Sequence, residues 1–265
     1  MTERIRVVLS DVDSTQIIHG QKLPSPAVQT AAHDLRRNGV YLSEATSRSY
    51  PLIRDLVGPL ALGNNLCTLD GGATVAHADT GEVAWSHWLS PESTRNVVTS
   101  IGHLCTRIHF DAESRGRTRD EVLAAMEAGA ITAEGRASIF AIFGVRDGDE
   151  ILDLLGDVEG IHHTPIMDYK NRPDLRCIQV VNPGVDKQYG VEQMLMVADL
   201  SDARALAIGD GTNDFALFRA VEANGGVKVA MGNAPDELKD EAHWVAPSID
   251  DHGFAVAMER YGLIS

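Results

Sequence analysis

The sequence predicts an α/β fold in which a parallel sheet forms a core and a separate α+β unit is inserted into that core. Strand-like and helix-like segments alternate at both ends of the 265-residue chain, which is typical of βαβ units around a parallel sheet. Between residues 83 and 179 the strands and helices are joined by longer polar segments, and the alternation returns after Pro183 and Gly184. These observations place the core at 1–82 and 180–265 and the inserted unit at 83–179.

The first part of the core begins with a buried strand and an amphipathic helix. Residues 5–10 form an apolar run that is typical of a strand covered on both faces. Residues 26–38 have the pattern of an amphipathic helix, with Pro26 in the first turn and Gly39 just past the end. The next predicted elements are a strand at 40–45, a helix at 49–57 and a strand at 66–69.

The inserted unit and the second part of the core continue the series of elements. In the inserted unit we expect strands at 82–89, 107–112, 137–145, 161–168 and 176–182, and helices near 91–104, 118–128 and 147–155. In the second part of the core we expect helices near 188–198, 213–222 and from about 253, and strands at 204–210 and 227–231.

Composition and charge exclude several classes of protein. Hydrophobic residues make up 44% of the chain and charged residues 23%, which is ordinary for a soluble globular protein. The formal net charge of −15 makes nucleic acid and anionic membranes poor partners, because both attract a basic surface. An anionic substrate would therefore need local cations, supplied by a metal ion or by a few Lys and Arg side chains.

The cysteines and the hydropathy pattern indicate a cytoplasmic protein. Cys67, Cys105 and Cys177 are widely spaced and include no CxxC pair, which favours reduced thiols over disulfides or a zinc site. The sequence contains no apolar stretch of the roughly 20 residues that span a bilayer, and its first residues show no signal pattern. We expect a monomer or a homodimer.

Two aspartates follow the first predicted strand and form the first candidate site. Asp11 and Asp13 are one residue apart, and ligands of open α/β sheets bind outside the carboxyl ends of the strands. Two neighbouring carboxylates repel each other unless a cation lies between them, and Mg²⁺ prefers such oxygen ligands. A simple turn or helix cap remains an alternative, as does the DxD pattern of metal-dependent glycosyltransferases.

A second acidic centre follows the predicted strand at 204–210. This strand runs into Asp210, and Asn213 and Asp214 open the following helix. Because parallel strands end at the same edge of a sheet, we expect Asp210 to lie near Asp11. The alternative is a Gly-Asp turn capped by Asn213. The segment does not have the residue spacing of a calcium-binding loop or of a dinucleotide-binding loop.

Four further residues are candidates for binding an anion. Lys187 lies at the start of a predicted core helix, and Thr46, Ser47 and Arg48 follow the second predicted strand. Free backbone N–H groups at such positions bind either a capping side chain or a phosphate. A solvated surface lysine and a helix cap are therefore the alternatives.

Four segments in a fixed order identify a family. They are DVDST at 11–15, ATSR at 45–48, DKQYG at 186–190 and GDGTND at 209–214. The chain resembles the haloacid dehalogenase-like hydrolases, specifically the Cof-type sugar-phosphatase branch with a type IIB cap, which is related to mannosyl-3-phosphoglycerate and sucrose phosphatases. The segments at 66–75, 229–242 and 250–258 are also similar to that branch, with Asp70 where Asn is usual. The resemblance implies a Rossmann-like three-layer core with a parallel sheet and an inserted α+β cap domain that selects the substrate.

The resemblance also implies a role for each motif residue. Asp11 matches the nucleophile that forms an aspartyl-phosphate, and Asp13 matches the general acid and base. Mg²⁺ would be bound by Asp11, the backbone carbonyl of Asp13, and Asp210. The implied phosphate binders are Thr46, Ser47, Lys187 and Asn213, and the implied supporting residues are Asp214 and Arg48.

Two positions depart from the pattern of the family. Ser14 and Ser47 stand where the family has glycines. Glycine permits a positive φ and a close approach of the backbone to phosphate, so a serine at positive φ would cost about 1–2 kcal/mol. All the charged groups of the motifs are present, and we therefore expect activity to survive.

The function that follows is a Mg²⁺-dependent phosphatase acting on a small phosphorylated metabolite, either a sugar phosphate or a phosphoglycerate-type compound. Alternatives are a sugar phosphomutase and a phosphate-binding module in which the serines have silenced the chemistry. Substrate selection is expected from the cap, where the candidate residues are His109, Arg115, Arg117 and Arg119, and the sequence ranks none of them.

Overall fold

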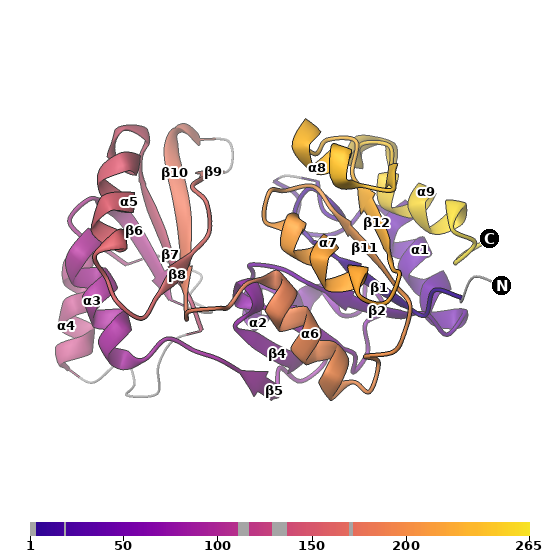
Figure 1. The fold of residues 1–265 in the computed structure, drawn as a ribbon, viewed down its shortest axis with the longest axis horizontal. Helices are drawn as coiled ribbons and strands as arrows, with labels where there is room; N and C mark the ends of the chain where they lie inside the picture. The colour runs from indigo at the N-terminus through magenta and orange to yellow at the C-terminus, as the bar shows by residue number, and fades with distance from the viewer. Residues whose placement is uncertain (1–3, 19, 111–116, 129–136, 170–171) are drawn as a thin grey trace. The chain divides into compact units, whose positions relative to one another are not determined.

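The computed structural model describes residues 4–18, 20–110, 117–128, 137–169 and 172–265 (Figure 1). The chain divides into two compact units. The core unit comprises residues 1–85 and 186–265, and the inserted unit comprises residues 86–185.

The core unit is built on a parallel sheet of strand order β13-β12-β11-β1-β2. Its strands are β1 (Val7–Ser10), β2 (Tyr41–Glu44), β11 (Ala205–Gly209), β12 (Val227–Ala230) and β13 (Trp244–Val245). All four residues of β1 are buried, because β1 is an interior strand between β11 and β2 and both of its faces are covered. The predicted α/β fold with a parallel sheet is confirmed.

Helices cover both faces of this sheet and complete a three-layer core (Figure 1). On one face, α1 (Pro26–Arg37) and α9 (Gly253–Arg260) pack against β-strand residues such as Val8. On the other face, α6 (Lys187–Val197) and α7 (Asp214–Glu222) pack against Val7 and Leu9. Adjacent residues of β1 therefore contribute to opposite hydrophobic clusters, as strand geometry requires.

Smaller elements surround the sheet of the core unit. The strands β3 (Leu66–Leu69), β4 (Thr74–His77) and β5 (Val83–Ser86) form an antiparallel sheet in the order β3-β4-β5. The expected helix at 49–57 is a short α-helix, α2 (Tyr50–Ile53), followed by the 3-10 turn η1 (Arg54–Leu56). The remaining elements are η2 (Asp70–Gly72), α8 (Asp236–Glu241) and η4 (Ile249–Asp251).

The inserted unit is an antiparallel sheet with helices packed on one face. Its strands are β6 (Cys105–Phe110), β7 (Ile139–Gly144), β8 (His162–His163), β9 (Met167–Tyr169) and β10 (Arg172–Val181). The helices α3 (Pro91–Ile101), α4 (Arg119–Glu127) and α5 (Gly148–Gly156) supply apolar side chains to one hydrophobic cluster with β6, β7 and β10, and the 3-10 turn η3 (Val145–Asp147) precedes α5. The predicted α+β character of this unit is confirmed.

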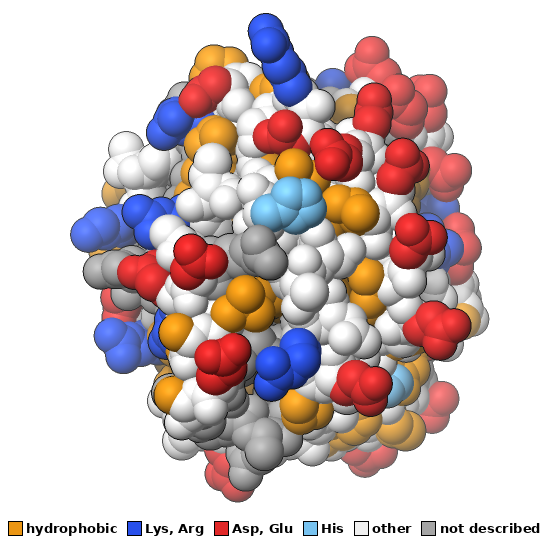
Figure 2. Space-filling view, turned by 90° about the vertical axis from the view of Figure 1, so that its left-hand side faces the viewer, with side chains coloured by type: hydrophobic (Ala, Val, Ile, Leu, Met, Phe, Trp, Pro, Cys, Tyr) orange, Lys and Arg blue, Asp and Glu red, His pale blue; other side chains and the backbone are white. Residues whose placement is uncertain are grey.

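The surface carries charges of both signs. Figure 2 shows the left-hand side of Figure 1, where charged side chains of both signs surround small hydrophobic patches. Among the helices within the described ranges, none combines the length and the apolar character that a membrane crossing requires.

Candidate active site

The polar residues that follow the strands of the core meet at one edge of the sheet. Asp11 follows β1, and its backbone N–H donates to the carbonyl of Ile208 in β11 at 3.0 Å. The hydroxyl of Thr15 donates to Oδ1 of Asp210 at 3.1 Å, although the two residues are 195 positions apart. The carboxyl ends of parallel strands therefore bring the two predicted acidic centres together.

Lys187 joins two of the acidic residues. Lys187 is 3% exposed, and its ammonium group donates to Oδ1 of Asp11 at 2.6 Å and to Oδ1 of Asp214 at 2.7 Å. The Asp186 side chain caps α6 by accepting from the N–H of Tyr189, which fixes the helix start that carries Lys187. Burial alone would lower the pKa of Lys187, but the two carboxylates raise it above its ordinary value. Lys187 is therefore charged.

Three carboxylates gather around this single lysine. Ligand atoms of Asp11, Asp210 and Asp214 all lie within 4.8 Å of one another. Burial raises the pKa of Asp11 well above its usual range; Asp214, Asp210 and Asp13 add to the rise, and Lys187 opposes it. Burial and the charge of Asp214 raise the pKa of Asp210 to about 7. The cluster has more negative than positive charge, and its oxygen donors suit a hard divalent cation.

Asp214 supports the cluster from the start of α7. Its Oδ1 accepts from Lys187, and its Oδ2 accepts from the N–H groups of Asp210 and Gly211, each at 2.9 Å. Because both oxygens are already bonded and the residue is fully buried, Asp214 is better placed to orient Lys187 and Asp210 than to bind a metal directly.

The Asp13 side chain pairs with Arg48 and is not one of the three carboxylates of the cluster. Nε and Nη2 of Arg48 donate to Oδ2 and Oδ1 of Asp13 at 2.9 and 2.7 Å, and Nη1 donates to the carbonyl of Leu52. The Asp13 side chain is 61% exposed, so water can reach it. This exposure allows the Asp13 carboxylate to exchange a proton with water, while its charge still acts on Asp11 and Asp210.

The other predicted anion binders lie on two loops of the core. Thr46 is buried, and its Oγ1 accepts from the N–H of Arg48 at 3.1 Å, which leaves its own hydroxyl proton for another acceptor. Ser47 is half-buried on the same loop. Asn213 is half-buried at the N-cap of α7, where its side chain makes no capping bond.

Asn233 also belongs to this site. The sequence analysis did not identify it as a site residue and only included it in the segment 229–242, which is similar to the family. Its Nδ2 donates to the carbonyl of Ser14 at 3.0 Å and to Oδ2 of Asp210 at 3.2 Å, and its Oδ1 accepts from the N–H of Ile249. Thr15 was missed in the same way and bonds the other oxygen of Asp210. The available signal for Asn233 was its place just after a predicted parallel strand.

The two serines that replace family glycines have different backbone conformations. Ser14 has a φ of +59°, whereas Ser47 is not among the residues of positive φ. The strain that was expected of a serine in these loops therefore applies to Ser14 and not to Ser47.

The Ser14→Gly variant is expected to stabilise the protein by about 0.5–1 kcal/mol. The relief of the left-handed strain, about 1–2 kcal/mol, exceeds the extra entropy that glycine loses on folding. Denaturant titration measures the change. Ser47→Gly is the matched control, and it should lower the stability slightly or leave it unchanged. Equal gains in both variants would contradict the role assigned to φ.

The candidate cap residues remain without a ranking. His109 lies edge-on to Phe140, with ring centroids 6.4 Å apart, and Arg117 is half-buried. Arg115 and the side chain of Arg119 lie outside the described residues.

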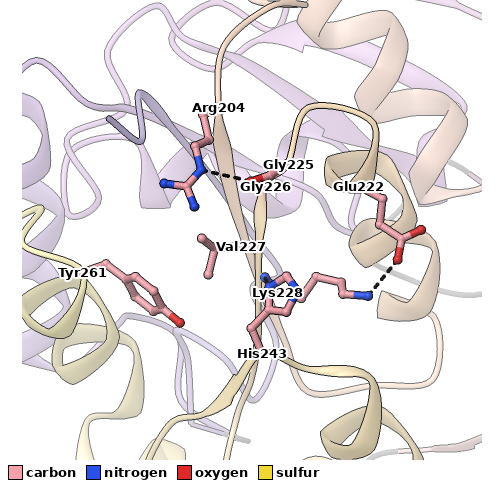
Figure 3. A pocket seen from close by; sticks show the side chains of 8 residues that line it. All are labelled: Arg204, Glu222, Gly225, Gly226, Val227, Lys228, His243 and Tyr261. Atoms are coloured by element: carbon pink, nitrogen blue, oxygen red, sulfur yellow. Dashed lines mark hydrogen bonds and ion pairs between the residues drawn. The ribbon is translucent and has the colours of Figure 1, made fainter. Parts of the chain in front are cut away.

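A cavity of about 490 Å³ lies at the other ends of the core strands, away from Asp11 (Figure 3). Arg204 precedes β11, and Lys228 is near the start of β12. Both cations are already engaged: Lys228 with Glu222 at 2.7 Å, and Arg204 Nε with the carbonyl of Gly225 at 3.0 Å. The neutral carbonyl leaves the charge of Arg204 in place, but among the described residues only Asp11, Asp210 and Asp214 form a group that could hold a metal ion, so the acidic cluster is the stronger candidate site.

Comparison with known proteins identifies similar sequences. A family profile described as haloacid dehalogenase-like hydrolase matches residues 132–258. The putative phosphatase YkrA of Bacillus subtilis is 24% identical over 269 residues, which cover 98% of each chain. The HMP-PP phosphatase of Cronobacter sakazakii is 27% identical over 248 residues, covering 87% of this chain and 85% of that protein.

Solved structures show the same fold. BT1666 from Bacteroides thetaiotaomicron, described as a phosphatase of the haloalkanoate superfamily, matches with a TM-score of 0.76 and 20% identity over 99% of this chain and 97% of that one. BT4131, described as a HAD subclass IIB sugar phosphatase, matches with a TM-score of 0.75 and 18% identity over 98% of this chain and all of that one.

Proposed function

We propose that the chain is a haloacid dehalogenase-like hydrolase, as the profile match over residues 132–258 and the two phosphatase relatives support, and that it acts as a Mg²⁺-dependent phosphatase. Its substrate would be a small phosphorylated metabolite, either a sugar phosphate or a phosphoglycerate-type compound. The observation that carries the proposal is the contact of Asp11 with Lys187 beside Asp210, at the carboxyl edge of the parallel sheet. In this proposal the same cluster would supply the nucleophile, a fixed positive charge and the ligands for a cation.

In the proposed reaction, a carboxylate oxygen of Asp11 attacks phosphorus, the P–O bond to the leaving alcohol breaks, and Asp13 gives that alcohol its proton. An aspartyl-phosphate results. Asp13 then takes a proton from water, and the water attacks phosphorus and releases inorganic phosphate and the free Asp11 carboxylate. The exposed side chain of Asp13 supports this double role, because it can exchange a proton in both steps.

Positive charge and hydrogen bonds would stabilise the transferring phosphoryl group. Lys187 holds one oxygen of Asp11 and so lies next to the position that the phosphoryl group would take. The hydroxyl of Thr46 is a second candidate donor. Asp11, the carbonyl of Asp13 and Asp210 would bind Mg²⁺, which would neutralise the excess negative charge and align the phosphate oxygens.

The inserted unit is proposed as the cap that selects the substrate. It leaves the core after Trp85, and the chain re-enters the core at Asp186, immediately before Lys187. A movement of the inserted unit could thus be transmitted through the chain to the residue that holds Asp11. The three cysteines are all free, which is consistent with the expected cytoplasmic location.

Phosphate release from a panel of phosphorylated sugars, glycerates and an aryl phosphate tests the proposal. We expect release in the presence of Mg²⁺ and a fall of about 100-fold or more after chelation, because the clustered carboxylates would then face the anionic substrate with Lys187 as their only partner cation in the cluster. Added Mg²⁺ should restore the rate. Transfer of the phosphoryl group within a sugar phosphate, dependent on a sugar bisphosphate, would indicate a mutase. Binding of Mg²⁺ without any turnover would indicate a silenced module.

A further inference from the structure

Gln16 and Glu44 form a buried polar pair inside the hydrophobic core. Gln16 is 1% exposed and Glu44 is fully buried. Nε2 of Gln16 donates to Oε1 of Glu44 at 3.2 Å, across 28 positions of sequence. Neither residue is part of the acidic cluster described above, and the proposed reaction assigns no role to either.

One hydrogen bond leaves both side chains incompletely bonded. Oε1 of Gln16 and Oε2 of Glu44 have no partner within the part of the chain that the structure describes. If Glu44 were ionised, both of these oxygens would be acceptors, and a buried carboxylate would be left with a single hydrogen bond. That state is costly in a protein interior.

The nearby cations oppose the burial-driven rise in the pKa of Glu44 only in part, because each is paired with another carboxylate. Lys187 is bonded to Asp11 and Asp214, and Arg48 is bonded to Asp13. A proton on Oε2 of Glu44 would supply the missing donor. Its acceptor would be Oε1 of Gln16, the other atom that lacks a partner. The carboxylic acid and the amide would then be joined by two hydrogen bonds. In agreement, burial raises the pKa of Glu44 well above its usual range, opposed by the hydrogen bond from Gln16.

The pair joins the two loops that carry Asp13 and Thr46. Gln16 lies in the turn that follows β1, where its N–H donates to the carbonyl of Val12 at 3.0 Å. Glu44 is the last residue of β2, two positions before Thr46. The exposed ion pair of Arg48 and Asp13 links the same two loops at the surface, so the buried pair is their second connection.

We propose that Gln16 and Glu44 form a neutral acid–amide pair, with the Glu44 proton donated to Oε1 of Gln16, and that this pair positions Asp13 relative to Thr46. The inference rests on the proposed phosphatase function for its catalytic consequence. Its protonation state can be tested without any activity.

The stability of the protein should then depend on pH through Glu44. The titratable or charged groups that act on Glu44, or whose own pKa Glu44 affects, are Asp11, Arg48, Lys187 and Cys67. Since folding raises the pKa of Glu44, the folded state holds this proton more tightly than the unfolded state does. The stability associated with Glu44 is therefore fully present below the ordinary pKa of glutamate and is lost as the pH rises toward the raised value.

Four variants separate the parts of the inference. Glu44→Gln preserves both hydrogen bonds without a titratable proton, whereas Glu44→Leu and Gln16→Leu each leave one polar partner unpaired. The double Leu variant removes both partners. Ser43→Ala is the matched control, because Ser43 is buried on the same strand but faces the other side of the sheet.

We expect Glu44→Gln to retain kcat within about twofold, and Glu44→Leu and the double variant to lose kcat on the order of tenfold with little change in KM. The melting temperature of the parent should fall relative to that of Glu44→Gln as the pH rises from 5 to 9. A difference infrared spectrum of parent minus Glu44→Gln, with Mg²⁺ present, should show the carbonyl band of a protonated carboxyl group. Ser43→Ala should retain the kcat and the pH profile of the parent.

Several results would overturn the inference. An unchanged kcat in the double Leu variant would remove the positioning role, and equal losses in Glu44→Gln and Glu44→Leu would show that a negative charge is what matters. Absence of the carboxyl band would rule out the acid–amide pair. Failure of the parent to hydrolyse any substrate would instead reject the proposed function and with it the positioning role, while the infrared band would still decide the protonation state.

Discussion

Asp11→Asn is expected to lower phosphate release by about four orders of magnitude or more, because the amide cannot attack phosphorus. The fold should remain intact. Asn has the shape of Asp, and the change removes one of the carboxylates that crowd Lys187, which keeps Asp214 as its partner. We expect the free energy of unfolding to stay within about 1 kcal/mol of the parent value. Rate assays with Mg²⁺ and denaturant titrations measure the two quantities.

Two further variants make the assignment of the nucleophile specific. In the first step, measured as the burst of released alcohol in a single turnover, Asp13→Asn should lose much less rate on an aryl phosphate than on a sugar phosphate, since a good leaving group needs no proton. Asp11→Asn should lose this step equally on both substrates. Asp55→Asn is the surface control, with a side chain 82% exposed, and should behave like the parent. Near-normal turnover in Asp11→Asn would show that another group attacks phosphorus.

The sequence predicts the central strands well because burial on both faces produces apolar runs. The strand expected at 66–69 coincides with β3, and the strand expected at 204–210 contains β11. Among the α-helices and strands, the sequence did not predict β4, α8 and β13, and the single strand expected at 161–168 is the two strands β8 and β9. β13 has only two residues and α8 only six, and such short elements are formed by tertiary contacts more than by local periodicity.

The site is predictable only where the fold places residues at a common edge. Asp11 and Asp210 could be grouped from sequence because parallel strands end together. The contacts between side chains could not. Arg48 and Asp13 are 35 positions apart, and Gln16 and Glu44 are 28 apart. Neither pair belongs to one helix or strand, so no periodic pattern relates its members, and only the packed loops bring them together.

Lys187→Met is expected to cost both stability and activity. The change leaves the carboxylates of Asp11 and Asp214, which are 7% and 0% exposed, facing each other without a cation. Breaking a buried ion pair in this way costs about 3–5 kcal/mol, measured by denaturant titration without metal. The deficit should shrink as the pH falls, because burial already raises the pKa of Asp11 and protonation removes its charge. Lys239→Met is the control, since its partner Asp236 is 95% exposed.

The double variant Lys187→Met, Asp214→Asn separates the structural role of Lys187 from its catalytic role. Removing the second carboxylate should recover much of the lost stability, whereas kcat should stay about 100-fold or more below that of the parent, because the positive charge of Lys187 would no longer face the transferring phosphoryl group. Mg²⁺ should also stabilise Lys187→Met more than it stabilises the parent, since the ion would be the remaining compensation for the clustered carboxylates. If Lys187→Met were as stable as the parent at neutral pH without metal, the carboxylates would have to be protonated in the folded protein, and the ion-pair description of the site would be wrong.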